Sequence, residues 1–327
     1  MSRAMPPLSG KNAAAVALAT AVGAMPDTRF AAIDGAWFDD LQRDLLLARL
    51  NFVPLFREVR DQPAQAASPY LVELRNRVEI EEVVALVAGR PAVVFWSWPE
   101  GSDRPIEEMA RHLRGLNLVE IPAGADDPEA EEKAAARASP QPQWETVLFR
   151  HTDPNVLAGL LPLFGPAQVS RLLGRATHLL FDAPDYRFEA PGGESLRGAP
   201  RPADLPLPPH GMLRINPQQY ELLTRRQTHV SRLEIMDYLR ENATEEVADQ
   251  DDRTLFESVR EADEVALELG MESGEARGLF AYLSVTTGGT SLQAPEIRDA
   301  FSSGAATPDD TMRAIFQEMT DAAGREG

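Results

Sequence analysis

The chain has 327 residues, of which 43% are hydrophobic and 25% charged, a composition that is ordinary for a globular protein and a length that suits two domains. Its formal net charge of −19 argues against nucleic-acid binding and against anionic membranes, because both present negative charge that repels an acidic protein. The absence of cysteine excludes disulfides, thiolate nucleophiles and cysteine-bound zinc.

The amino-terminal segment is rich in alanine. Residues 12–25 follow Lys11 and carry faint features of a signal peptide. The segment is shorter than the roughly 20 apolar residues that a membrane span needs, and it is Ala-rich rather than Leu-rich. We therefore interpret residues 1–28 as a helical amino-terminal extension of a cytoplasmic protein without membrane insertion.

From residue 29 to residue 188, short apolar runs alternate with helical patterns, which predicts an α/β domain. Residues 29–35 are typical of a strand, and Trp37, Leu41 and Leu45 then recur on one face of a predicted helix over 37–50. Residues 92–98 are apolar on both faces except at Ser97, so we expect a central strand. The other predicted elements of this domain are strands at 52–56, 69–74, 117–122, 145–151 and 177–184, and helices at 78–89, from 105 and from 154.

The remaining segments differ in character. Residues 123–142 are acidic and rich in Ala and Pro, which predicts a mobile loop, and the Pro- and Gly-rich residues 189–213 indicate an extended linker. Residues 214–327 become helical in pattern. The predicted fold class is therefore α/β, with a mixed-sheet lobe over 29–188 followed by an all-α lobe over 214–327; the strand order stays open.

The residue types that usually carry catalysis show no recognisable site pattern. None of the five histidines lies in H-x-x-x-H or H-E-x-x-H, and no nucleophile elbow, phosphate loop or dinucleotide fingerprint occurs. His151 and Asp153 form the best acid–base pair. However, Asp153 precedes Pro154 at a predicted helix start, where capping explains it. We expect no catalytic residue, no metal and no cofactor.

The stretch IDGAWFDDL places Asp34, Asp39 and Asp40 close together, as a metal-dependent enzyme would. Asp39 and Asp40 fall in the first turn of the predicted helix, where each negative charge is favourable by roughly 0.3–1 kcal/mol. Neighbouring helical residues also point about 100° apart, which does not suit a shared metal. We favour the interpretation in which these acids start the helix.

Five segments in sequence resemble a known bacterial family. They are FAAIDGAWFDDL, PLF…SPYLVEL, ARHLRGLNLVEI, VLFRHTDPNVLAGLLP and THLLFDAP, and they cover residues 29–184. Their order and spacing are similar to those of the domain-of-unknown-function family of type VI secretion effector adaptors, and the helical tail also resembles that family's carboxy-terminal lobe. The resemblance implies a non-enzymatic cytoplasmic chaperone that binds the amino-terminal segment of an effector toxin and helps load it onto the VgrG spike.

The resemblance also implies a set of pattern positions in this chain. The family usually has aromatic residues where this chain has His151 and Thr152, and a basic residue where it has Asn155, which leaves the particular partner open. The pattern positions, most of them expected to be structural, are Asp34, Gly35, Trp37, Pro69, Tyr70, His112, Leu113, Arg114, Arg150, Asp153 and Pro154.

An adaptor must cover an apolar segment of its client, which exposed apolar patches with polar rims can do. The aromatic candidates also fit ordinary core packing, and arginines that anchor client carboxylates also fit solvated ion pairs. The candidates for partner contact are Trp96, Trp98, Trp144, Phe56, Arg114, Arg150, His151 and Asp153.

Two other function classes stay open. One is a metal-dependent hydrolase or phosphoryl-transfer enzyme that uses Asp34, Asp39 and Asp40. The other is a toxin or an immunity protein from a toxin gene cluster, which would suit the acidic tail, where residues 241–275 hold thirteen acidic side chains. The sequence leaves open the client, the stoichiometry, and which lobe binds which partner.

Overall fold

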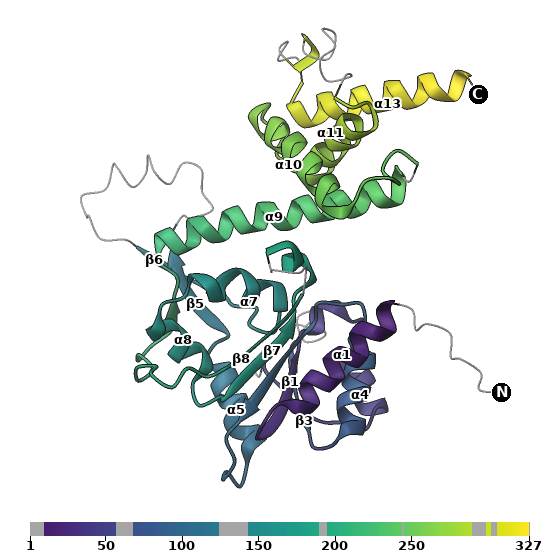
Figure 1. Ribbon diagram of the computed structural model, residues 1–327. Coiled ribbons are helices and arrows are strands. Elements are labelled where there is room, and N and C mark those ends of the chain that lie inside the picture. The colour runs from purple at the N-terminus through teal and green to yellow at the C-terminus, as the bar shows by residue number, and fades with distance from the viewer. Residues whose placement is uncertain are drawn as a thin grey trace, which may run out of the picture. The chain divides into compact units, whose positions relative to one another are not determined.

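The computed structural model describes residues 10–56, 68–123, 143–189, 195–243, 245–289, 299–301 and 306–326. Its contacts divide the chain into two compact units, Met1–Thr224 and Arg225–Gly327. The first unit combines strands and helices and the second is helical, so the predicted α/β fold class is confirmed (Figure 1). None of the helices in the described part is long and apolar enough to cross a membrane.

The amino-terminal unit is built on a six-stranded sheet in the order β2-β3-β1-β4-β7-β8, whose paired strands are antiparallel. Strand β4 (Val93–Trp98) lies in its interior and is buried at every position, as its two apolar faces predict. The other strands are β1 (Thr28–Ile33), β2 (Asn51–Pro54), β3 (Tyr70–Leu74), β7 (His178–Asp182) and β8 (Leu196–Pro200).

A second, three-stranded sheet has the order β6-β5-β9. Strand β5 (Leu118–Pro122) pairs antiparallel with β6 (Trp144–Leu148) and parallel with the short β9 (Leu213–Arg214). Strand directions in this unit are therefore mixed. The predicted strand at 117–122 is confirmed, the one predicted at 145–151 ends at Leu148, and the two pair in a sheet separate from the six-stranded one.

Helices α1 (Gly10–Ala24), α2 (Leu41–Leu47) and α4 (Arg77–Leu86) pack on one face of the six-stranded sheet. Side chains alternate along β1, so Ala31 and Ile33 join this core while Phe30 points to the other face. Figure 1 shows α1 and α4 side by side, with α5 (Pro105–Arg114) on the opposite side of the sheet. Helices α7 (Pro154–Leu160) and α8 (Pro166–Leu173) complete this unit.

The predicted helix over 37–50 is shorter than expected. Gly35–Trp37 forms a separate 3-10 turn, η1, followed by extended backbone at Phe38. Asp40 then caps α2, its Oδ1 accepting a hydrogen bond from the Arg43 N–H at 3.0 Å. Trp37 is therefore not on the buried stripe of α2 and is 42% exposed.

The segment 189–213, which we expected to be an extended linker, carries a strand of the main sheet. Within it, β8 pairs with β7 over His178↔Pro200 to Asp182↔Leu196. Its pattern is not that of a buried strand because it is the edge strand and Gly198–Pro200 is exposed. The contact boundary between the units falls later, inside α9 (Pro217–Asn242). The predicted loop at 123–142 lies outside the described residues, apart from Ala123.

The carboxy-terminal unit contains α10 (Asp252–Glu268), α11 (Gly274–Thr286) and α13 (Pro308–Glu326) beside the end of α9. Helix α10 buries one face, which includes Leu255 and Val259. Asp263 is fully buried on the same helix, where its two oxygens accept hydrogen bonds from the Nε atoms of Arg232 at 2.8 Å and Arg277 at 2.6 Å.

Candidate functional site

Three pattern residues from distant parts of the chain meet in one cluster, which we call the Arg150 cluster: Asp34, Arg150 and Asp153. Asp34 follows β1, and the other two lie in the turn between β6 and α7. Arg150 donates to Asp34 Oδ2 from Nη2 at 2.7 Å and from Nε at 3.2 Å. The same Nη2 lies 3.4 Å from Asp153 Oδ2. Asp34 is only 4% exposed, whereas the Arg150 side chain is 46% exposed.

Both carboxylates of this cluster also cap local backbone. Asp34 Oδ1 accepts from the Ala36 N–H at 3.0 Å and closes the η1 turn. Asp153 Oδ1 accepts from the Asn155 N–H at 2.9 Å, with Pro154 at the first position of α7. The predicted cap at Asp153 is therefore confirmed, and each acid combines a backbone cap with an ionic contact.

The charges in the cluster are unequally compensated. Burial alone lowers the pKa of Arg150, but the charge of Asp34, its hydrogen bond and the charge of Asp153 outweigh burial and raise that pKa. Burial raises the pKa of the Asp153 carboxyl more than Arg150 and two backbone N–H groups lower it. Arg150 Nη2 lies 2.7 Å from Asp34 Oδ2 but 3.4 Å from Asp153 Oδ2, so Asp34 is the main counter-ion of Arg150.

Residues next to this cluster fasten the end of β2. Asn117 donates from Nδ2 to the Leu55 carbonyl at 3.1 Å, and its Oδ1 lies 2.9 Å from His151 Nε2, which therefore carries the ring proton. Arg114 donates from Nη2 to the Pro54 carbonyl at 2.6 Å. Burial lowers the pKa of His151 to about 3, so this ring is neutral near pH 7. His151 and Arg114, both candidates for partner contact, thus hold a strand end in place.

His112, on α5, has a similar structural role. Its Nε2 lies 2.9 Å from the Leu172 carbonyl, and burial lowers the pKa of the ring. Gly174 ends α8 at a φ of +55° directly against this ring, and a Cβ there would lie 2.6 Å from His112 Nδ1. The glycine is therefore required both by its backbone conformation and by the close approach of the histidine.

The two tryptophans of β4, which we expected as partner-contact candidates, are buried. Trp96 is 0% exposed and Trp98 is 3% exposed. Trp98 donates from Nε1 to Glu108 Oε2 at 3.3 Å, and the Arg175 guanidinium lies 5.7 Å from its ring centroid. Both are core residues in this structure, because β4 lies inside the sheet and each of its faces is covered.

The other two aromatic candidates lie nearer the surface. Phe56 follows β2 and is half-buried. Trp144 begins β6, also half-buried, with the Arg214 guanidinium 4.4 Å from its ring centroid. Pro69 precedes β3, and its carbonyl accepts a hydrogen bond from the Leu55 N–H at 2.8 Å. Tyr70 opens β3, and its ring packs edge-on against Phe52 with the centroids 5.5 Å apart, so both residues have structural contacts.

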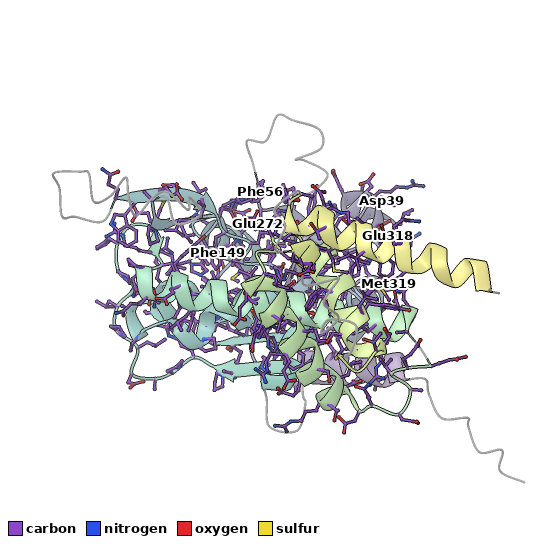
Figure 2. All side chains as sticks on the ribbon, turned by 90° about the horizontal axis from the view of Figure 1, so that it is seen from above. Asp39, Phe56, Phe149, Glu272, Glu318 and Met319 are labelled. Atoms are coloured by element: carbon purple, nitrogen blue, oxygen red, sulfur yellow. The ribbon has the colours of Figure 1, made fainter. Side chains whose placement is uncertain are left out.

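The three acids of the IDGAWFDDL stretch serve different roles. Asp34 belongs to the Arg150 cluster, and Asp40 caps α2. Asp39 is exposed and lies well apart from Phe149, the neighbour of Arg150, in Figure 2. Within the described ranges no group of three or more His, Cys, Asp or Glu side chains is placed to hold a metal ion. The caps formed by Asp34 and Asp40, together with the ion pair of Asp34, support the scaffold interpretation for these two residues.

Sequence reasoning missed several exposed apolar side chains of this unit. Trp37, Leu46 and Leu47 are 42%, 61% and 71% exposed around α2. Leu118 and Leu148 are also exposed, and they face each other across β5 and β6 in direct register. The run of three leucines at 45–47 carried this signal, since a helix that packs on one side cannot bury three consecutive residues.

Comparison with known proteins gives a family match for part of the chain. A family model described as "Domain of unknown function (DUF4123)" matches residues 29–130. The matched span runs from β1 through β5, so it includes Asp34, Tyr70, His112 and Arg114 but ends before Arg150 and Asp153. Searches of curated proteins and of solved structures give no match.

Proposed function

We propose that this chain is a non-enzymatic cytoplasmic adaptor of a type VI secretion system, which binds the amino-terminal segment of an effector toxin and helps load it onto VgrG. The proposal rests on the resemblance of residues 29–184 to effector adaptors, and the family model that matches residues 29–130 supports it. The helical carboxy-terminal unit fits the second lobe that the resemblance implies.

The observation that carries the proposal is the role of the pattern residues. Asp34 and Asp153 pair with Arg150 and cap backbone, and the half-buried His112 and the buried His151 lie beside backbone or amide oxygens. These groups build a scaffold. Apolar side chains of the same unit lie exposed, which is the chemistry needed to cover a client segment without covalent steps.

The test is co-expression of the tagged full chain with the toxin encoded beside it and with VgrG. A complex of fixed stoichiometry with the toxin, stable through size exclusion, is expected. A chain that elutes alone in the presence of both proteins would end the proposal. Calorimetric titration with Mg²⁺ and Ca²⁺ addresses the enzyme alternative, and growth of cells that express the chain alone addresses the toxin alternative.

A further inference from the structure

Two adjoining hollows form a groove between α1 and α4, which we call the α1–α4 groove. The first hollow has a volume of about 580 Å³ and the second about 340 Å³. Both are lined by Ala15 and Val84, so they are continuous along the two helices. Figure 1 shows α1 and α4 lying side by side at this place.

Small residues of α1 form one wall of the groove, and larger apolar residues of α4 form the other. Ala15, Ala19 and Gly23 recur every four residues on α1, so they share one face and present no more than a methyl group. Ile80 and Val84, also four apart, supply larger apolar side chains from α4. From Ala15 to Gly23 this wall extends for about 12 Å, which corresponds to somewhat more than two helical turns.

Charged side chains also line both hollows: Arg29, Arg77 and Glu81 in the first, and Arg90 and Asp182 in the second. Asp182 lines the second hollow, and its Oδ1 is buried with no donor among the described residues. Arg90 lines the same hollow, but its guanidinium stacks over the Phe38 ring at 4.7 Å. Arg29 lines the first hollow; its Nη1 donates to the Gly23 carbonyl at 2.9 Å, while its Nε is buried with no acceptor in the described part.

These observations specify the chemistry of an occupant. The walls of the first hollow are mainly helix surfaces whose backbone groups are bonded internally, so they offer no edge for an added strand, whereas a third helix fits between two. The second hollow is completed by the loop after α4 and by Pro154, Asp182 and Pro184. Small side chains on α1 allow its backbone close approach. A lysine or arginine on the occupant would complement the charge of Asp182, which lines the second hollow, and an acid or the free carbonyls at its carboxy-terminal end would complement the charge of Arg29, which lines the first.

We propose that the α1–α4 groove binds an apolar helix of the effector's amino-terminal segment, with a basic side chain of that helix on Asp182. This inference rests on the proposed function and adds the surface and the client chemistry. Helix α1 lies outside the matched residues 29–130. One wall of the groove therefore comes from a segment outside the family match, and we infer that it contributes to client choice.

The test uses full-length chains and the toxin encoded beside them, followed by fluorescent peptides that tile the toxin's amino-terminal segment. Ala19→Trp and Ala85→Trp fill the groove from its two walls. Ala17→Trp is the matched control, because Ala17 is exposed on α1 and does not line either hollow. Asp182→Asn removes the charge at nearly constant volume. Thermal melting of each variant shows whether it is folded.

Peptide affinity is expected to fall by more than tenfold in both groove variants, to stay unchanged in Ala17→Trp, and to fall by about 30-fold or more in Asp182→Asn. If Ala19→Trp does not fold, the exposed Ala85→Trp decides. Retention of the toxin by every variant would overturn the groove inference and leave the proposed function standing. Failure of the wild-type chain to bind the toxin would overturn both. Conversion of a dimer into a monomer by the groove variants, seen by light scattering, would instead make the groove an interface between copies and overturn the inference.

Discussion

Replacing Asp34 by asparagine removes the ion pair of this residue but keeps its backbone cap. An asparagine keeps an oxygen that can accept from the Ala36 N–H, so the η1 turn retains its cap. What is lost is the charge opposite Arg150, at 2.7 Å and 3.2 Å from two guanidinium nitrogens. The substitution therefore isolates the ionic contribution of a buried carboxylate.

The size of the expected stability loss follows from how deeply Asp34 and Arg150 are each buried. Breaking a fully buried ion pair costs about 3–5 kcal/mol. Asp34 is buried, but the Arg150 side chain is 46% exposed, so water and Asp153 compensate part of the loss. We expect Asp34→Asn to lower the free energy of unfolding of the amino-terminal unit by about 1.5–3 kcal/mol.

Urea denaturation followed by tryptophan fluorescence measures this change in the right part of the molecule. All four tryptophans, at positions 37, 96, 98 and 144, belong to the amino-terminal unit. The exposed Asp39→Asn is the matched control and should change stability by less than about 0.5 kcal/mol. An Asp34→Asn protein as stable as the wild type, or more stable, would refute the scaffold role, since strained functional acids are the ones whose removal stabilises.

Three further predictions concern other parts of the chain. Burial lowers the pKa of His151 to about 3 in the fold, whereas an unperturbed histidine has a pKa of 6.5, so the unfolded chain binds more protons between these values. Stability should therefore fall by up to about 2 kcal/mol from pH 6.5 to pH 5, and His151→Gln should flatten this part of the urea-midpoint profile. Gly174→Ala should lower the free energy of unfolding by more than about 2 kcal/mol, because the added Cβ would overlap the His112 ring. Gly89→Ala, at a positive φ but with no atom near the added Cβ, should lower it by only about 1 kcal/mol. Asp263→Asn should destabilise the carboxy-terminal unit by about 3 kcal/mol or more, seen as faster hydrogen exchange in α10 and α11, because two arginines lose their shared counter-ion; unchanged exchange would contradict this account of the unit.

The strands of the amino-terminal unit were predictable where the pattern was unambiguous. The run at 92–98 is apolar on both faces and proved to be an interior strand. The cap at Asp153 was equally legible, since Asp153 and Pro154 open α7 as expected. In each case the signal is local, so one sequence contains it.

What could not be predicted depends on contacts distant in sequence. Asp34 and Arg150 are separated by 116 positions, and no spacing rule brings them together. Strand β8 lacks an apolar pattern because it lies at an edge, and it becomes a strand only by pairing with β7. The burial of Trp96 and Trp98 likewise follows from helices packed over β4, since an aromatic residue on a strand suits a core and a contact surface alike.

The most direct test of an adaptor that works through its surfaces alone is light scattering of the full chain co-purified with the effector toxin proposed as its client. The account predicts a mass equal to that of a defined complex of the two proteins, with Asp34→Asn weakening it only as far as the variant unfolds. A mass equal to that of this chain alone, with the toxin present and folded, would contradict it.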